Sequence, residues 1–120
     1  MQYMEIATKM EADEKFHFED AKYSVVIPKD MEDFKKEGTT LNHCVYSNYF
    51  EKAAKGEVWI FFIRRKEALD KPFFTLEIKD GKIIQCFGVN NHTPLQEKVE
   101  DVNDFVNEFH EHLLYGSKKV

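Results

Sequence analysis

The sequence predicts an α+β domain, in which a mostly antiparallel sheet of about four strands carries two main helices. Three observations predict this class. Apolar runs of strand length are separated by turn residues, an Asp-Gly dipeptide joins two of these runs, and two longer segments carry apolar residues at helical spacing. With 120 residues the chain is long enough to bury a core of its own. We therefore expect one domain over residues 1–120.

Composition and charge exclude some classes of protein. The 42% hydrophobic residues, with 11 Phe, favour a globular domain with an aromatic core. A formal net charge of -5 argues against nonspecific binding to the phosphate backbone of nucleic acids. Two cysteines without a secretory segment favour a reduced cytoplasmic protein, and no apolar run has the length of a membrane span.

The chain begins with a weak helical pattern followed by a strand. Residues 1–15 place three apolar side chains at roughly helical spacing, namely Met4, Ala7 and Met10. This pattern predicts either a short docking helix or a frayed tail. The β-branched residues that follow predict an edge strand near 22–27.

Two helices are expected next, separated by a glycine. Asp30 is a suitable cap for a short helix that runs through Glu37, and Gly38 then occupies the position after the last turn. Asn42 is a candidate cap for a second helix over 43–55, which carries apolar residues on one side.

A continuous apolar run at 58–65 predicts a central strand that is buried on both faces. Strands at 73–79 and 82–88 are joined by Asp80-Gly81, a dipeptide that favours a type I′ hairpin. The three predicted strands, together with that at 22–27, complete the sheet.

A uniform register through this hairpin places Thr75 and Glu77 side by side on a mixed face. In that register Glu77 lies opposite Ile84, and Gln85 interrupts the apolar face of the hairpin. The mixed face is therefore the expected place for a site.

The last helix is expected over 94–115, where Thr93 and Gln96 form a capping box around Pro94. One side of this helix is apolar, and the other side is acidic. An acidic face is most often a solvated surface, although it can also engage a basic partner.

Several short motifs follow one another along the chain: Gly38 to Val45 followed by Tyr49, Ile63-Arg64, Thr75 to Ile78, and Gln85 to Gly88 with Asn90 or Asn91. In this order they resemble the signature "EG..L.HCV..Y" and the further motifs "IR", "TLEI" and "Q..G..N" of the PcfJ-like family of conjugative plasmid and phage proteins. The similarity covers about residues 23–110. Tyr46 stands where the family usually has glycine, and the family's larger members carry long N-terminal regions.

The resemblance implies an origin on a mobile genetic element or phage and carries no reaction with it. Three hypotheses follow. The first is an accessory or regulatory module that binds a protein or nucleoprotein of DNA transfer, conjugation or host defence, with anti-defence inhibition of a nuclease as one version. The second is a small enzyme of unknown reaction, and the third is a direct nucleic-acid binder, which the net charge disfavours.

The candidate catalytic residues are His43, Cys44 and Glu77. A thiol at a helix N-terminus beside an imidazole can become a nucleophile, but a cysteine next to Val45 is as readily a small buried hydrophobe. Neighbouring helical residues point about 100° apart, so His43 is poorly placed as a base for Cys44. His43 would instead need a partner from elsewhere in the fold, for which Glu77 is the natural proposal.

The candidate binding residues are polar groups at strand ends and in the turn after the hairpin: Arg64, Thr75, Gln85, Asn90 and Asn91. Buried polar groups need partners, so a self-satisfied network of Arg64, Glu77 and Gln85 is as good an interpretation as a ligand site. No metal-binding spacing or phosphate loop is present, and we expect neither metal nor cofactor.

Overall fold

The computed structural model of the protein describes residues 2–43 and 49–116. Four antiparallel strands form one sheet in the order β1-β2-β3-β4: β1 (Tyr23–Val26), β2 (Trp59–Arg65), β3 (Phe74–Lys79) and β4 (Lys82–Phe87). The α-helices in these residues are α1 (Gln2–Glu11), α2 (Met31–Leu41), α3 (Phe50–Ala54) and α4 (Asp101–Tyr115). The predicted α+β class and all four predicted strands are confirmed.

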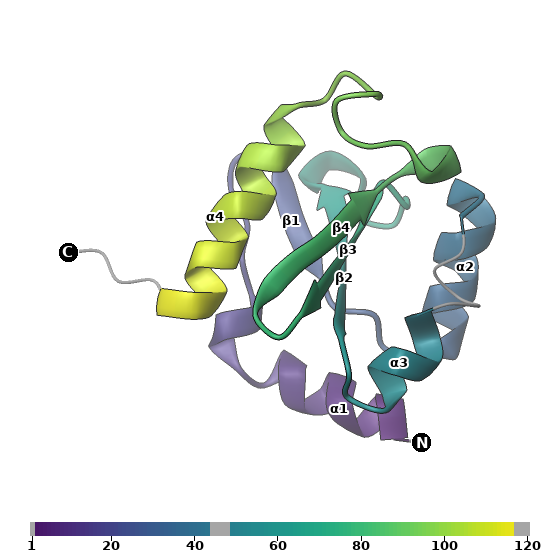
Figure 1. The fold of residues 1–120 in the computed structure, drawn as a ribbon, viewed down its shortest axis with the longest axis vertical. Helices are drawn as coiled ribbons and strands as arrows, with labels where there is room; N and C mark the ends of the chain where they lie inside the picture. The colour runs from purple at the N-terminus through teal and green to yellow at the C-terminus, as the bar shows by residue number, and fades with distance from the viewer. Residues whose placement is uncertain (1, 44–48, 117–120) are drawn as a thin grey trace.

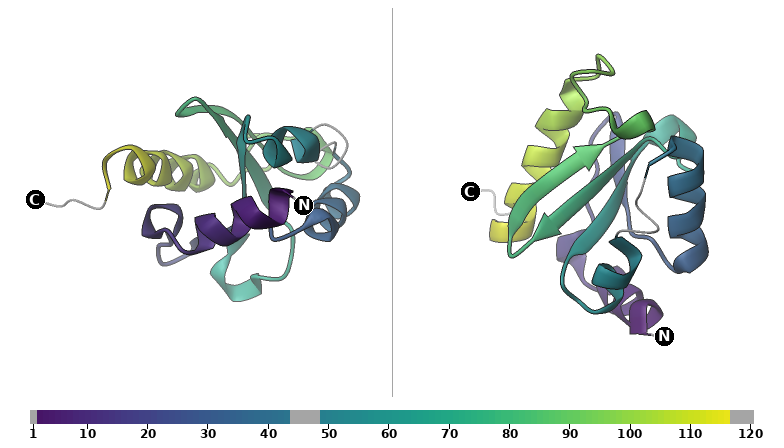
Figure 2. Two further views of the ribbon diagram at one scale, coloured as in Figure 1. Left: turned by 90° about the horizontal axis from the view of Figure 1, so that it is seen from below. Right: turned by 45° about the vertical axis from the view of Figure 1, so that its right-hand side comes forward.

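The sheet is sandwiched between helices. Figures 1 and 2 show α4 along one face, α2 and α3 along the other, and α1 across one end. Alternate residues of β2 face these two layers: the Phe61 ring lies 4.9 Å from that of Phe109 in α4, and the Phe62 ring lies 6.0 Å from that of Phe34 in α2. Burial on both faces explains why β2 is a continuous apolar run.

Helix α1 is docked on the domain through one face. Tyr3, Ala7 and Met10 are buried, whereas Met4 is 60% exposed. The Tyr3 ring contacts the rings of Phe34 in α2 and Phe50 in α3 at 5.2 and 5.8 Å. Of the two interpretations offered for residues 1–15, the docking helix describes this segment, with Tyr3 in place of Met4 on the inner face.

The predicted helix boundaries around Gly38 were wrong. Helix α2 continues through Gly38 to Leu41, and Asn42 adopts a left-handed conformation (φ 55°) that ends it. Continuation of the helix places Phe34, Glu37 and Leu41 on one buried face, which favours it over an early stop. Asn42 is therefore a C-cap and not an N-cap, because asparagine tolerates the left-handed region.

The expected helix over 43–55 is also corrected. The structure has a short helix, α3, at Phe50–Ala54, and residues 44–48 lie outside the described residues. Its N-cap, Tyr49, makes no side-chain capping hydrogen bond. Leu41, which precedes the predicted helix, belongs to α2.

The hairpin begins as predicted and then departs from a uniform register. Asp80 and Gly81 both have positive φ, as a type I′ turn requires, and Ile78 pairs with Ile83. A β-bulge at Ile84 then shifts the pairing, so that Glu77 lies opposite Gln85. The predicted pairing of Glu77 with Ile84 was wrong, because the extra residue moves Gln85 from the apolar face to the polar one.

The capping box before α4 forms, but the helix does not follow directly from it. The Thr93 amide donates to Gln96 Oε1 at 2.8 Å, and the Gln96 amide donates to Thr93 Oγ1 at 3.2 Å. Lys98 then has a φ of 60°, which interrupts the helical turn. The predicted start of the last helix at residue 94 is corrected to Asp101.

Across the described ranges, none of the helices combines enough length with enough apolar character to pass through a lipid bilayer.

Candidate functional site

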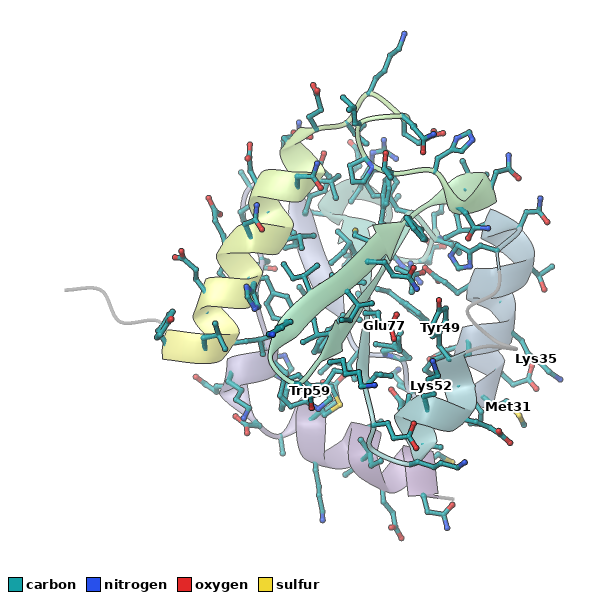
Figure 3. All side chains as sticks on the ribbon, in the orientation of Figure 1. Met31, Lys35, Tyr49, Lys52, Trp59 and Glu77 are labelled. Carbon is teal, nitrogen blue, oxygen red and sulfur yellow. The ribbon has the colours of Figure 1, made fainter. Side chains whose placement is uncertain are left out.

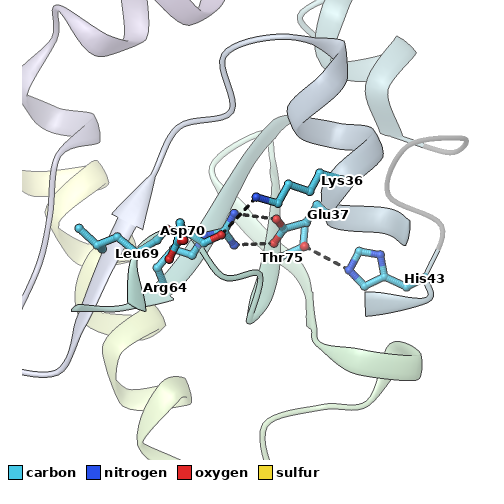
Figure 4. Close-up of polar contacts among 7 residues, drawn as sticks. All are labelled: Lys36, Glu37, His43, Arg64, Leu69, Asp70 and Thr75. Atoms are coloured by element: carbon cyan, nitrogen blue, oxygen red, sulfur yellow. Dashed lines mark hydrogen bonds and ion pairs between the residues drawn. The ribbon is translucent and has the colours of Figure 1, made fainter. Parts of the chain in front are cut away.

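The first part of the candidate site is a buried ion pair between α2 and β2. Arg64 Nη1 and Nη2 donate to the two carboxylate oxygens of Glu37, each at 2.7 Å (Figure 4). Glu37 is 0% exposed and Arg64 is 6% exposed. Arg64 Nε also donates to the carbonyl of Leu69 at 3.1 Å, and this third hydrogen bond fixes the orientation of the guanidinium plane. The pair therefore fixes the middle of α2 to the end of β2.

Thr75 and His43 extend this pair into a chain of hydrogen bonds. The Thr75 hydroxyl bonds to the Glu37 carboxylate, and His43 Nε2 lies 3.2 Å from Thr75 Oγ1. An ionised carboxylate can only accept, so Thr75 donates to Glu37 and accepts from His43. This order requires the proton of the neutral imidazole to lie on Nε2. The series Arg64–Glu37–Thr75–His43 thus runs from the sheet to the end of α2, and Figure 4 marks its Arg64–Glu37 and Thr75–His43 bonds.

Burial is the largest influence on the pKa values of Glu37 and His43. Complete burial raises the pKa of Glu37, and the hydrogen bonds and charge of Arg64 oppose that shift by favouring the carboxylate. Burial lowers the pKa of His43, because the charged imidazolium loses more hydration than the neutral ring. His43 is therefore a neutral imidazole at pH 7.

A second polar cluster lies on the same face of the sheet, toward α3. The Gln85 amide donates to Glu77 Oε1 at 2.9 Å and also to the hydroxyl of Tyr49. Glu77 is 5% exposed, and Gln85 and Tyr49 are half-buried. The bulge at Ile84 makes this contact possible, since it places Gln85 directly opposite Glu77.

The turn after β4 is tied to the end of α2. Asn42 Nδ2 donates to Asn90 Oδ1 at 2.7 Å, and Asn90 and Asn91 both have positive φ. The Gly88 amide donates to the carbonyl of His92 at 2.8 Å, which closes the turn. The Asn90 side chain therefore contacts Asn42, the neighbour of His43. Asn91 contributes to the turn through its left-handed backbone conformation.

The comparisons with known proteins identify the family. The model of the PcfJ-like protein family matches residues 2–103. The chain belongs to the PcfJ-like protein family. A protein of Listeria innocua serovar 6a, "Uncharacterized protein Lin1253/Lin1744", is 38% identical over 84 residues. The match covers 69% of this chain and 18% of that relative, so the chain spans less than a fifth of the relative's length. No solved structure gives a significant match.

The motifs that resemble those of PcfJ-like proteins come together in this fold. Glu37 of the "EG" motif, Arg64 of "IR" and Thr75 of "TLEI" are joined in the first chain of hydrogen bonds. Glu77 of "TLEI" and Gln85 of "Q..G..N" form the second cluster. Motifs far apart in the sequence thus build one polar layer between the sheet and the helices α2 and α3.

The structure brings together some predicted partners and separates others. The ring of His43 bonds to Thr75, and Glu77 bonds to Gln85 rather than to His43. Arg64 pairs with Glu37 and not with Glu77 or Gln85. The network of Arg64, Glu77 and Gln85 that the sequence suggested is therefore replaced by two separate clusters.

Glu37 and Tyr49 belong to these clusters and were not among the predicted site residues. Glu37 lies three residues after Phe34 and four before Leu41, which places it on the inner face of a continuous helix. A glutamate at such a position, with an arginine in a buried strand, is a signal for a buried pair. The assumed helix end at Gly38 concealed it.

The predicted nucleophile, Cys44, lies outside the described residues, and the thiol that the structure describes is that of Cys86. Burial raises the pKa of Cys86 to about 12, which suppresses the reactive thiolate. Cys44 belongs to residues 44–48, which the structure does not describe. Within residues 2–43 and 49–116, no three His, Cys, Asp or Glu side chains are grouped as metal ligands.

Proposed function

We propose that this PcfJ-like chain is an accessory or regulatory binding module of a mobile genetic element or phage. It acts on a protein or nucleoprotein of DNA transfer or host defence, and inhibition of a defence nuclease is one form of that action. One observation carries the preference for binding over catalysis. The polar side chains suggested for catalysis are engaged with one another inside the fold, in the pairs Arg64–Glu37, His43–Thr75 and Gln85–Glu77.

This pairing favours a structural use of the polar layer. A catalytic site needs a nucleophile or base, and an electrophilic group, directed at one open position for the substrate. Here Glu37, Arg64 and Thr75, which hold or orient the His43 ring, are all less than a tenth exposed. The layer therefore supports a rigid scaffold whose outer surface is free to contact a partner.

The expected partner is basic. The formal net charge of -5 favours association with a positively charged protein surface and opposes direct contact with nucleic acid. Proteins and nucleoproteins of DNA transfer or host defence present basic surfaces where they bind DNA or RNA. Direct nucleic-acid binding by this chain remains the least favoured of the three hypotheses.

Removing the imidazole of His43 distinguishes a binding module from an enzyme. The variants His43→Asn and Thr75→Val are expressed in cells that carry the mobile element or are infected by the phage, with transfer frequency or phage yield as the readout. A binding module retains its effect within about twofold in variants that stay folded. A loss of effect in His43→Asn, with an unchanged circular dichroism spectrum and an unchanged effect of Glu5→Gln on the exposed side of α1, would contradict the proposal.

A second candidate function rests on His43. Its neutral, half-buried imidazole, oriented by Thr75, has the protonation state that a general base requires. In this alternative Glu37 and Arg64 would position the ring through Thr75 rather than meet the substrate. The same variants decide between the two functions.

A further inference from the structure

Glu77 is a buried carboxylate that has no cationic partner in the described part of the chain. It is 5% exposed, and its hydrogen bond comes from the neutral amide of Gln85. The ion pairs found within residues 2–43 and 49–116 do not include it. By contrast, the buried Glu37 holds Arg64 at 2.7 Å. A buried charge raises the free energy of the folded protein when no opposite charge is near. A cation bound at Glu77 would therefore stabilise the protein.

An aromatic ring lies beside this carboxylate. The Gln85 amide that donates to Glu77 also donates to the hydroxyl of Tyr49, so the three side chains form one cluster. The Lys52 ammonium lies 5.6 Å from the centroid of the Tyr49 ring, on a face that attracts positive charge. Figure 3 shows Glu77, Tyr49 and Lys52 on the side of the sheet that faces α3.

The bulge in β4 builds this cluster at the edge of the sheet. β4 is the last strand in the sheet order, and the extra residue, Ile84, is 51% exposed. Without the bulge, Gln85 would point to the opposite face, and Glu77 would lose its amide partner. Bulges often redirect a side chain next to a binding site. Glu77 lies on the inner strand β3, and the half-buried side chains of Gln85 and Tyr49 connect it to the solvent.

We propose that Glu77, Gln85 and Tyr49 form a receptor for one arginine side chain of the partner protein. A planar guanidinium can donate to a carboxylate and at the same time stack on an aromatic ring, whereas an ammonium offers no planar surface for stacking. The negative charge of the chain favours the approach of such a group. This inference rests on the proposed function, because it names the chemistry by which the module holds a protein partner.

The experiment is an NMR titration of the whole 15N-labelled chain with N-acetylarginine amide. N-acetylcitrulline amide serves as the neutral probe of nearly the same shape. We expect saturable shifts centred on residues 49, 77 and 85 with the arginine probe, and shifts at least tenfold weaker with the citrulline probe. The variant Glu77→Gln should weaken arginine binding at least tenfold, while Glu5→Gln, which removes an exposed charge from α1, should leave it unchanged.

Three results would overturn the receptor. These are equal shifts from both probes, equal arginine binding by Glu77→Gln and the wild type, and shifts confined to the acidic side of α4. If Glu77→Gln does not fold, Tyr49→Leu retains the carboxylate and should weaken arginine binding about threefold to tenfold. Unchanged binding in that variant would also overturn the receptor. These measurements need no partner, so their failure is distinct from a failure of the cellular test of the proposed function.

Discussion

Glu37 and Arg64 connect α2 to β2 through side chains that have almost no exposed surface. Each carboxylate oxygen accepts one guanidinium hydrogen bond, so the pair is held in a single geometry. Such a pair contributes less to the free energy of unfolding than its contacts suggest, because both ions lost their hydration on folding. Removal of one partner has a larger effect on stability, because it leaves the other charge buried and unpaired.

The first prediction concerns this pair. Glu37→Met should reduce the free energy of unfolding by about 3–5 kcal/mol, because it leaves the Arg64 guanidinium buried without a counter-charge. The double variant Glu37→Met with Arg64→Met should recover most of that loss, as measured by urea denaturation. Lys22→Gln, which breaks the exposed pair with Asp101, is the control and should cost at most about 1 kcal/mol. A double variant as unstable as the sum of the single variants would contradict the prediction.

The second prediction follows from the lowered pKa of His43. In the unfolded chain the imidazole takes up a proton near pH 6.5, whereas the folded chain does so at lower pH. Between these values the unfolded state binds more protons, so stability falls as the pH decreases. The free energy of unfolding of the wild type, minus that of His43→Asn, should thus be larger at pH 8 than at pH 5.

Urea denaturation at pH 8, 7, 6 and 5 tests this behaviour. Subtracting the variant removes the contribution of the other titrating groups, and the lost hydrogen bond to Thr75 adds an offset that does not depend on pH. The difference should change below about pH 6.5 and level off at lower pH, once the folded state is protonated too. A difference that is constant from pH 8 to pH 5 would rule out the neutral, buried imidazole.

At the scale of elements, the junction between β4 and the following turn depends on close packing. A Cβ at Gly88 would lie 2.9 Å from the carbonyl oxygen of Phe73 and 2.9 Å from the Phe74 ring. The Gly88 amide also closes the turn that carries Asn90 to Asn42. Glycine at this position therefore connects the hairpin to the end of α2.

The third prediction tests that packing. Gly88→Ala should reduce the free energy of unfolding by about 1–3 kcal/mol, because backbone and ring atoms must move to make room for the methyl group. Gly56→Asn is the comparison for a substitution without a steric contact, since Gly56 has open space around it and asparagine limits the strain of its φ of +77°. Thermal unfolding of the wild type and both variants measures the two effects. Stability of Gly88→Ala equal to that of the wild type would show that the close contact is not required.

At the scale of the whole molecule, charge is the property that constrains function most. The formal net charge is -5, and the exposed side of α4 adds Asp104, Glu108 and Glu111 to one surface. Such a surface repels phosphate groups and attracts basic proteins. The sandwich of helices around the sheet leaves this charge on the outside, where it acts on any approaching partner (Figure 2).

The fourth prediction is that the purified chain does not bind nucleic acid. Electrophoretic mobility of single-stranded and double-stranded DNA and of RNA should not change with the protein at about 50 mM salt, where nonspecific binding is strong. A basic DNA-binding protein of similar size provides the positive control. A salt-sensitive shift with this chain would revive direct nucleic-acid binding as its function.

Much of the fold was predictable from local sequence patterns. The apolar run of β2, the β-branched run of β1 and the Asp80-Gly81 turn each predicted a strand or a hairpin that the structure contains. Helix boundaries were less predictable. Gly38 and Asn42 have strong local preferences for helix ends, and burial of Leu41 on the face of Phe34 decided which of them ends α2.

The candidate site was predictable in part of its residues but not in its contacts. The types and positions of the polar residues pointed to His43, Arg64, Thr75, Glu77 and Gln85, which all lie in the polar layer, but not to Glu37 or Tyr49. Their partners depend on register and on helix length. One bulge residue decided that Gln85 meets Glu77, and three further residues of helix after Gly38 decided that His43 meets Thr75.

The sequence by itself determined the fold class, the positions of the four strands, the family and the acidic character of the chain. These properties follow from hydrophobic periodicity, turn residues, motif order and charge, which are local or additive. Only the tertiary structure decided that Glu37 neutralises Arg64 and that Glu77 is left without a cation among the described residues. The pairing of buried charges depends on which faces meet across the sheet, and that is set by packing of the whole domain.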